Sequence, residues 1–116
     1  MIGTRSVTGL VAYSISKSAM DQMTACTALE LASKGVRVNS VNPGIIVTEM
    51  LHRFGITGDD YTQFIESAKQ VHPLGRLGEA DEVAQAIAFL ASSGSASFIT
   101  GEHLYVDGGL QAACPR

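Results

Sequence analysis

Residues 13–44 read YSISKSAMDQMTACTALELASKGVRVNSVNPG, and this stretch decides the fold. Apolar side chains recur at steps of three and four from Tyr13 to Lys34, which predicts one long helix. Lys34 and Gly35 supply the cation and the glycine that commonly end a helix. The segment from Val36 to Val41 is rich in β-branched residues and ends before the turn Pro43-Gly44, so it predicts a strand of a covered sheet. A helix that leads directly into a strand is half of a β-α-β unit, and we therefore expect an α/β fold.

The rest of the chain predicts two further helices and one more strand. In the irregular stretch 45–78, the turn Gly58-Asp59-Asp60 leads into an apolar pattern from Tyr61 to Val71 that is typical of a helix. A second helix is expected from about Glu79 to Ala91, with acidic residues at its N-terminal end. The segment from His103 to Val106 predicts a short strand. We interpret residues 1–116 as a single, partial domain.

The composition limits the possible partners. The net charge of −3 is scattered along the chain, which leaves no basic face for nucleic acid and no polybasic patch for a membrane. No apolar run reaches transmembrane length, so a small molecule or another protein is the expected partner. Two cysteines do not make a disulfide framework, which favours a cytoplasmic location and leaves a mitochondrial one open. No metal site is expected, because His52, His72 and His103 are far apart and lack further ligands at metal-binding spacing.

Tyr13 and Lys17 are the candidate catalytic pair. They are four residues apart at the start of a helix, so their side chains lie on one face about one turn apart. A free tyrosine, with a pKa of about 10, donates a proton poorly at neutral pH, but a nearby ammonium group and a helix N-terminus stabilise the phenolate. Such a pair can act as a general acid or base. By itself, the same spacing more often marks an aromatic ring beside an alkyl chain on a helix surface.

The surrounding motifs favour the catalytic interpretation, because together they resemble the short-chain dehydrogenase/reductase family, and its 3-oxoacyl-reductase-like members in particular. In chain order, the motifs that carry this resemblance are Tyr13-Ser14-Ile15-Ser16-Lys17, Gly35-Val36-Arg37-Val38-Asn39-Ser40-Val41-Asn42-Pro43-Gly44, Thr48-Glu49, Ile99-Thr100-Gly101 and Val106-Asp107-Gly108-Gly109. The resemblance implies a doubly wound, Rossmann-type parallel sheet, of which this chain supplies the C-terminal part without the first strands.

The resemblance also implies a function. It makes the protein an oxidoreductase that transfers a hydride between NAD or NADP and a carbonyl or alcohol substrate, and the sequence leaves the choice of nucleotide open. Tyr13 would be the proton donor or acceptor, and Lys17 would activate it and bind the nicotinamide ribose. Pro43, Gly44, Ile46 and Thr48 would line the nicotinamide side of the cofactor. From the residues alone, an ordinary Pro-Gly turn followed by a capping Thr48 is at least as good an interpretation.

Some parts of the family pattern have no counterpart in these residues. The family's catalytic serine would fall just before Met1, and neither the glycine-rich turn for the pyrophosphate nor the catalytic asparagine is found. We therefore expect a fragment or a shortened isoform that is inactive alone. The resemblance implies homo-oligomers through the helices at 13–34 and 79–91, and the alternative function is a non-catalytic isoform that binds full-length subunits. Residues 49–72 are expected to line an apolar substrate pocket, with a wall formed by Leu51, Phe54, Ile56, Tyr61 and Phe64.

Overall fold

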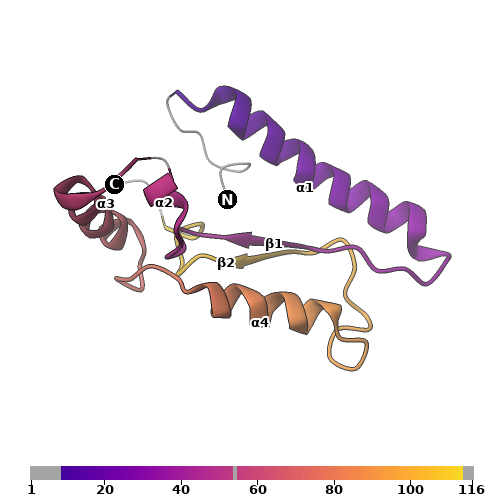
Figure 1. The fold of residues 1–116 in the computed structure, drawn as a ribbon. Helices are drawn as coiled ribbons and strands as arrows, with labels where there is room; N and C mark the ends of the chain where they lie inside the picture. The colour runs from indigo at the N-terminus through magenta and orange to yellow at the C-terminus, as the bar shows by residue number, and fades with distance from the viewer. Residues whose placement is uncertain (1–8, 54, 114–116) are drawn as a thin grey trace.

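The computed structural model describes residues 9–53 and 55–113 and shows an α/β arrangement in layers (Figure 1). Two parallel strands, β1 (Ser40–Pro43) and β2 (His103–Val106), pair with Ser40 opposite His103 and Pro43 opposite Val106. Helix α1 (Val11–Ala32) lies on one side of this pair, and α4 (Ala80–Ala91) lies on the other. The short α2 (Met50–Arg53) and α3 (Gly58–Val71) lie beyond the carboxyl ends of the strands. The α/β class expected from the sequence is confirmed.

Helix α1 begins and ends two residues earlier than the sequence predicted. Its C-terminal end closes through backbone hydrogen bonds from Gly35 N to Ala32 O (3.0 Å) and from Val36 N to Leu31 O (3.3 Å). Gly35 has a φ of +70°, a conformation that glycine adopts without strain and other residues rarely reach. The glycine that was predicted to end the helix therefore does so.

The predicted boundaries of the first strand, Val36 to Val41, are wrong, since β1 runs from Ser40 to Pro43. The reason is that the bonding before Ser40 is irregular, because side chains share it with a backbone hydrogen bond from Gly101 N to Val38 O (2.8 Å). Thr100 Oγ1 accepts the N–H of Val38 (3.1 Å), and the Asn39 side chain both donates to Ile99 O (3.0 Å) and accepts from Glu102 N (3.0 Å). Regular pairing between the two strands starts only after these contacts.

The other predicted elements differ from the structure mainly at their ends. The triplet Gly58-Asp59-Asp60, expected to be a turn, forms the first turn of α3, where its carboxylates suit the positive end of the helix. Glu79, expected inside α4, lies just before it, and its backbone N–H donates to Glu82 Oε2 (2.8 Å). The four-residue helix α2 was not predicted. The predicted strand from His103 to Val106 is confirmed.

Helix α1 meets the sheet through polar side chains. Asn42 Nδ2, on β1, donates to Asp21 Oδ1 at 3.2 Å, and His103 Nδ1, on β2, lies 3.8 Å from the same oxygen. Several apolar side chains of α1 stay exposed, with exposed fractions of 70% for Val11, 64% for Ile15 and 80% for Leu29. Within the described residues, no helix is long and apolar enough to cross a membrane.

Candidate active site

One cavity of about 510 Å³ brings the predicted site residues together at the carboxyl ends of the strands. Its walls come from the start of α1, from β1 and from the segment that follows β1. All of the predicted catalytic and cofactor-binding residues line it: Tyr13, Lys17, Pro43, Gly44, Ile46 and Thr48. Ligands of parallel α/β sheets bind at this end of the strands.

Tyr13 and Lys17 share one face of α1, as their spacing predicted. Lys17 Nζ lies 5.3 Å from the centre of the Tyr13 ring and also approaches Met20 Sδ at 3.9 Å. Tyr13 lies in the first turn of the helix and is about half exposed. The Tyr13 ring and an ammonium group are therefore adjacent in the wall of the cavity.

The segment after β1 is held by backbone hydrogen bonds to two other parts of the chain. Gly44 N donates to Val106 O (3.0 Å), which continues the strand pairing by one residue. Gly78 N then donates to Ile45 O (3.0 Å), and Val47 N donates to Gly78 O (2.9 Å). We call residues 43–48 the cavity turn. Its backbone is held by Val106 and Gly78, neither of which lines the cavity.

The packing around Gly44 leaves no room for a side chain. A Cβ atom at this position would lie 2.9 Å from the Cα atom of Asp107 and 2.9 Å from His72 Nε2. Both distances are shorter than real Cβ contacts, and one neighbour is backbone that cannot swing aside. A residue other than glycine is therefore excluded at position 44 by contacts with Asp107 and His72.

Thr48 makes the contact expected of a capping residue. Its Oγ1 accepts a hydrogen bond from the N–H of Met50, the first residue of α2, at 3.4 Å. Since the oxygen accepts this bond, the hydroxyl proton is still available for a group in the cavity. The two interpretations of Thr48 given above are therefore compatible.

The expected substrate wall is present in part. Met50 and Phe64 line the cavity from α2 and α3. Tyr61 instead stacks on His52, with ring centres 4.8 Å apart and planes inclined by 17°. Phe54 and the side chain of Leu51 lie outside the described part of the chain. The described wall is apolar, and Phe64 is the residue of the expected set that lines it.

Sequence reasoning missed two polar side chains beside the site, Asp21 and His72. Asp21 lies one turn after Lys17 on α1, also lines the cavity, and binds Asn42 at the end of β1. The i, i+4 spacing of Lys17 and Asp21 could have revealed it. His72 was considered only as a metal ligand. In the described residues, no three His, Cys, Asp or Glu side chains gather where they could hold a metal ion.

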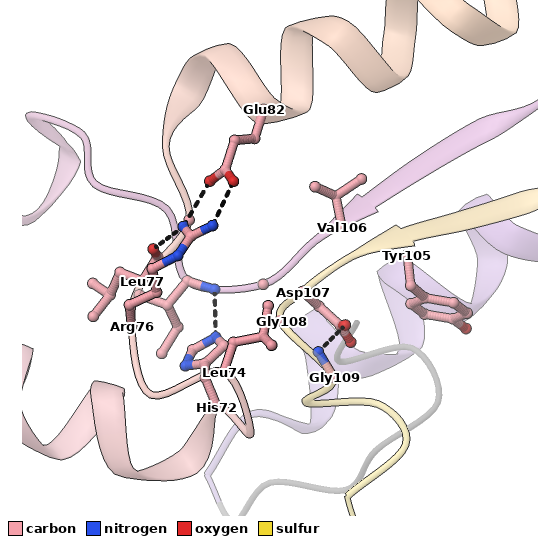
Figure 2. A pocket seen from close by; sticks show the side chains of 13 residues that line it. His72, Leu74, Arg76, Leu77, Glu82, Tyr105, Val106, Asp107, Gly108 and Gly109 are labelled. Atoms are coloured by element: carbon pink, nitrogen blue, oxygen red, sulfur yellow. Dashed lines mark hydrogen bonds and ion pairs between the residues drawn. The ribbon is translucent and has the colours of Figure 1, made fainter.

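A second pocket, of about 290 Å³, lies behind the cavity turn and contains the best-formed ion pair of the described chain (Figure 2). Arg76 and Glu82 meet through two hydrogen bonds, at 2.7 and 2.9 Å, and Arg76 Nη1 also donates to Leu77 O. The hydrogen bond from Arg76, together with that from the Glu79 backbone, lowers the pKa of Glu82 from 4.5 to about 2. The same pairing raises the pKa of Arg76.

This ion pair predicts an acid-dependent loss of stability. A carboxylate whose pKa is depressed by folding stabilises the folded state above its ordinary pKa, and this contribution disappears as the pH falls toward about 2. Glu82→Gln should therefore be less stable than the parent at neutral pH and should lose less stability between about pH 4.5 and 2. The measurement is the thermal unfolding midpoint of the complete natural protein and of its variants as a function of pH. Glu66→Gln, which removes another exposed carboxylate in an ion pair, is the control for net charge. Parallel curves for the parent and Glu82→Gln would contradict the assignment.

A family model and the sequences of known proteins both match this chain. A family model described as Enoyl-(Acyl carrier protein) reductase matches residues 1–111. Cyclohexanol dehydrogenase of an Acinetobacter species is 43% identical over 110 residues, which are 93% of this chain and 38% of that enzyme.

Solved structures agree with the sequence comparison. A short-chain dehydrogenase/reductase of unknown function from Caenorhabditis elegans, solved with cofactor, superposes with a TM-score of 0.88 at 31% identity, over 97% of this chain and 43% of that one. ElxO with NADP bound gives a TM-score of 0.83 at 35% identity, over 97% of this chain and 44% of that one. The chain thus spans less than half the length of each of these proteins.

Proposed function

The chain belongs to the short-chain dehydrogenase/reductase family, whose members use NAD or NADP, and from this membership we propose that it transfers a hydride between that cofactor and a carbonyl or alcohol. Tyr13 is the proton donor or acceptor of the proposed reaction. The observation that carries the proposal is the convergence of Tyr13, Lys17 and the cavity turn on one cavity. Folding brings these residues together from two separate segments, residues 13–17 and 43–48. Such convergence on one cavity is expected of a binding site and not of unrelated surface residues.

The donor groups around the cavity suit the nicotinamide end of the cofactor. The Lys17 ammonium group can bind ribose hydroxyls, and the Thr48 hydroxyl and the backbone of Ile46, which line the same cavity, can form hydrogen bonds with a carboxamide. Pro43 and Gly44 offer a surface without long side chains, against which a flat ring can pack. We assign the cofactor-binding role to Tyr13, Lys17, Pro43, Gly44, Ile46 and Thr48 on these grounds.

The chain's own residues account for the proton transfer. When bound, the cofactor supplies or accepts the hydride. In carbonyl reduction, Tyr13 donates its phenolic proton to the substrate oxygen as negative charge develops there, and in alcohol oxidation it takes the proton back. Lys17 stabilises the phenolate that remains, because its ammonium group lies close to the ring. Met50 and Phe64 favour a substrate whose carbonyl carries an apolar group.

The direct test follows reduced nicotinamide by its absorbance in the complete natural protein. Incubation with NADH or NADPH and a panel of small apolar aldehydes and ketones should give turnover with at least one nucleotide. Oxidation of the matching alcohols should proceed at higher pH, where a proton is more easily accepted. A protein that is folded and binds the nucleotide but turns over no member of either panel would contradict the proposal.

Lys17→Ala should weaken cofactor binding and also lower kcat in both reaction directions. Both effects arise because one ammonium group contacts the ribose and lies beside the Tyr13 ring, where it stabilises the charge that proton transfer leaves. The measurements are the KM for the cofactor and kcat. Lys34→Ala, which removes an exposed lysine just beyond the far end of α1, is the matched control. If Lys17→Ala matches the control in both measurements, Lys17 is a surface residue without a catalytic role.

We also propose that the protein forms homo-oligomers through α1 and α4. Exposed apolar side chains on both helices support this, including Leu29 on α1 and Ile87 on α4. The same faces support the alternative function, in which the chain binds full-length subunits without catalysing the reaction. The cysteine content given above favours a cytoplasmic location.

A further inference from the structure

His72 is one of the few buried polar side chains, and both of its ring nitrogens are bonded to backbone. It follows the last residue of α3 and is 3% exposed. Its Nδ1 lies 2.6 Å from Ala68 O, inside α3. Its Nε2 lies 3.3 Å from Ile45 N, in the cavity turn, as the dashed line at His72 shows (Figure 2). The ring therefore joins two segments that are 27 residues apart in the sequence.

These partners specify the protonation of the ring. A backbone N–H can only donate, so His72 Nε2 must accept from Ile45 and carries no proton. A carbonyl oxygen can only accept, so Nδ1 carries the proton and donates it to Ala68 O. The bonded ring is neutral, in the Nδ1–H tautomer. Imidazole is the side chain that can offer one acceptor and one donor at opposite edges of a rigid ring.

The two joined segments form different walls of the active-site cavity. Gly44, Ile45 and Ile46 belong to the cavity turn, and Phe64 lies on α3, the helix that His72 terminates. His72 itself does not line this cavity. It lies behind the turn, in the second pocket, where Gly44 packs against its Nε2 edge and Gly108 against its Cδ2.

The charged groups that share the pocket with the His72 ring bind other partners. Asp107, which lines the same pocket, accepts hydrogen bonds through its carboxylate from Gly109 N (3.0 Å) and Gln111 N (2.7 Å). Arg76 and Glu82, in the same pocket, pair with each other. The bond between His72 and Ile45 is therefore a link between a neutral ring and the backbone, with no ion pair to reinforce or replace it.

We propose that His72 is a positioning residue for the cofactor: by accepting the Ile45 N–H it holds the cavity turn in place against α3. The role rests on the proposed function, since it needs the turn to contact the nicotinamide. Without the ring acceptor, the partly buried Ile45 N–H would lose its partner behind the turn, and the cost of an unpaired donor favours a shift of the backbone toward another acceptor. The turn would then present Gly44 and Ile46 to the cofactor less often in the binding conformation.

Two nearly isosteric variants separate the two bonds of the ring. In His72→Gln, the side-chain oxygen can take the place of Nε2 and accept from Ile45, while the donor to Ala68 is lost. In His72→Asn, the amide nitrogen can take the place of Nδ1 and donate to Ala68, but no acceptor reaches Ile45. In the complete enzyme, we expect His72→Asn to raise the KM for the cofactor roughly tenfold, and His72→Gln to keep it within about threefold of the parent, with kcat little changed in both.

Measurements on the protein without cofactor test the link directly. The ¹⁵N chemical shifts of the His72 ring should show the Nδ1–H tautomer in the parent. Hydrogen exchange at the Ile45 amide should be faster in His72→Asn than in the parent, and near the parental rate in His72→Gln. Thermal unfolding checks that both variants fold, and if either does not, the tautomer and the parental protection of the Ile45 amide still decide the matter.

The outcomes that overturn the inference differ from those that overturn the proposed function. Equal changes of KM in the two variants, a ring protonated at Nε2, or an unprotected Ile45 amide in the folded parent would each refute the positioning role. Turnover that survives Tyr13→Phe would refute the proposed chemistry and leave the ring tautomer and the Ile45 exchange rates unaffected.

Discussion

Tyr13→Phe is expected to remove nearly all turnover from the complete enzyme while leaving its fold unchanged and weakening cofactor binding only by the loss of one hydroxyl among the six cofactor-binding residues. The ring stays, so its contact with the Lys17 ammonium group is kept in large part, but no proton can be transferred to or from the substrate oxygen. Loss of a general acid or base typically costs about 10²–10⁴ in rate. Since Tyr13 is about half exposed, removing its hydroxyl should cost little stability.

The measurement is kcat in both reaction directions, together with a cofactor titration that shows the binding site is intact. Tyr105→Phe is the matched control, because Tyr105 lies on β2 and lines the second pocket instead of the active-site cavity. A Tyr13→Phe enzyme with a kcat near that of the control would refute the catalytic role of Tyr13.

Residues 1–116 expressed by themselves should show no detectable binding of NADH or NADPH and no carbonyl reduction. Backbone amides of a glycine-rich turn hold the pyrophosphate in dinucleotide sites, and these residues contain no such turn. The family's serine, which polarises the carbonyl beside the tyrosine, is also absent from them, and removing one such donor costs about 10²–10³ in rate. In addition, two paired strands of four residues each form too small a sheet to be stable alone.

Fluorescence titration of the purified chain with each nucleotide measures this, and the complete natural protein under the same conditions is the control. Circular dichroism of the same sample shows whether the chain is folded. Saturable binding in the micromolar range would contradict the prediction, and it would mean that the cavity turn and α1 hold the cofactor without a pyrophosphate site.

The fold was predictable from the sequence where local signals agree. The strand at His103–Val106 has β-branched and aromatic residues and is followed by a glycine pair, and α1 has a clear helical period that Gly35 ends. The prediction was wrong for β1, because its start depends on Asn39 and Thr100. These residues are separated by about 60 positions, and their side chains interrupt the regular backbone pairing, of which one hydrogen bond, from Gly101 N to Val38 O, remains.

The site was predictable to the extent that it consists of motif residues. Tyr13, Lys17 and the cavity turn could be chosen from their spacing and from the family resemblance, and the structure brings them to one cavity. His72 could not be found in this way, because its role depends on two backbone atoms, one of them 27 residues away. Asp21 differs, because its spacing from Lys17 places it on the same face of α1 and could have revealed it, while its bond to Asn42 on β1 could not be predicted.

The bond between Asp21 and Asn42 has a consequence for how α1 sits along the sheet. Apolar contacts between a helix and a sheet tolerate sliding, because one methyl group can replace another, but a carboxylate needs its own donor. A slide of α1 by one helical turn, about 5.4 Å, would separate the carboxylate of Asp21 from the Asn42 amide and break this hydrogen bond. The pair therefore favours the observed axial position of α1. In that position Lys17, one turn before Asp21, lines the same cavity as the end of β1.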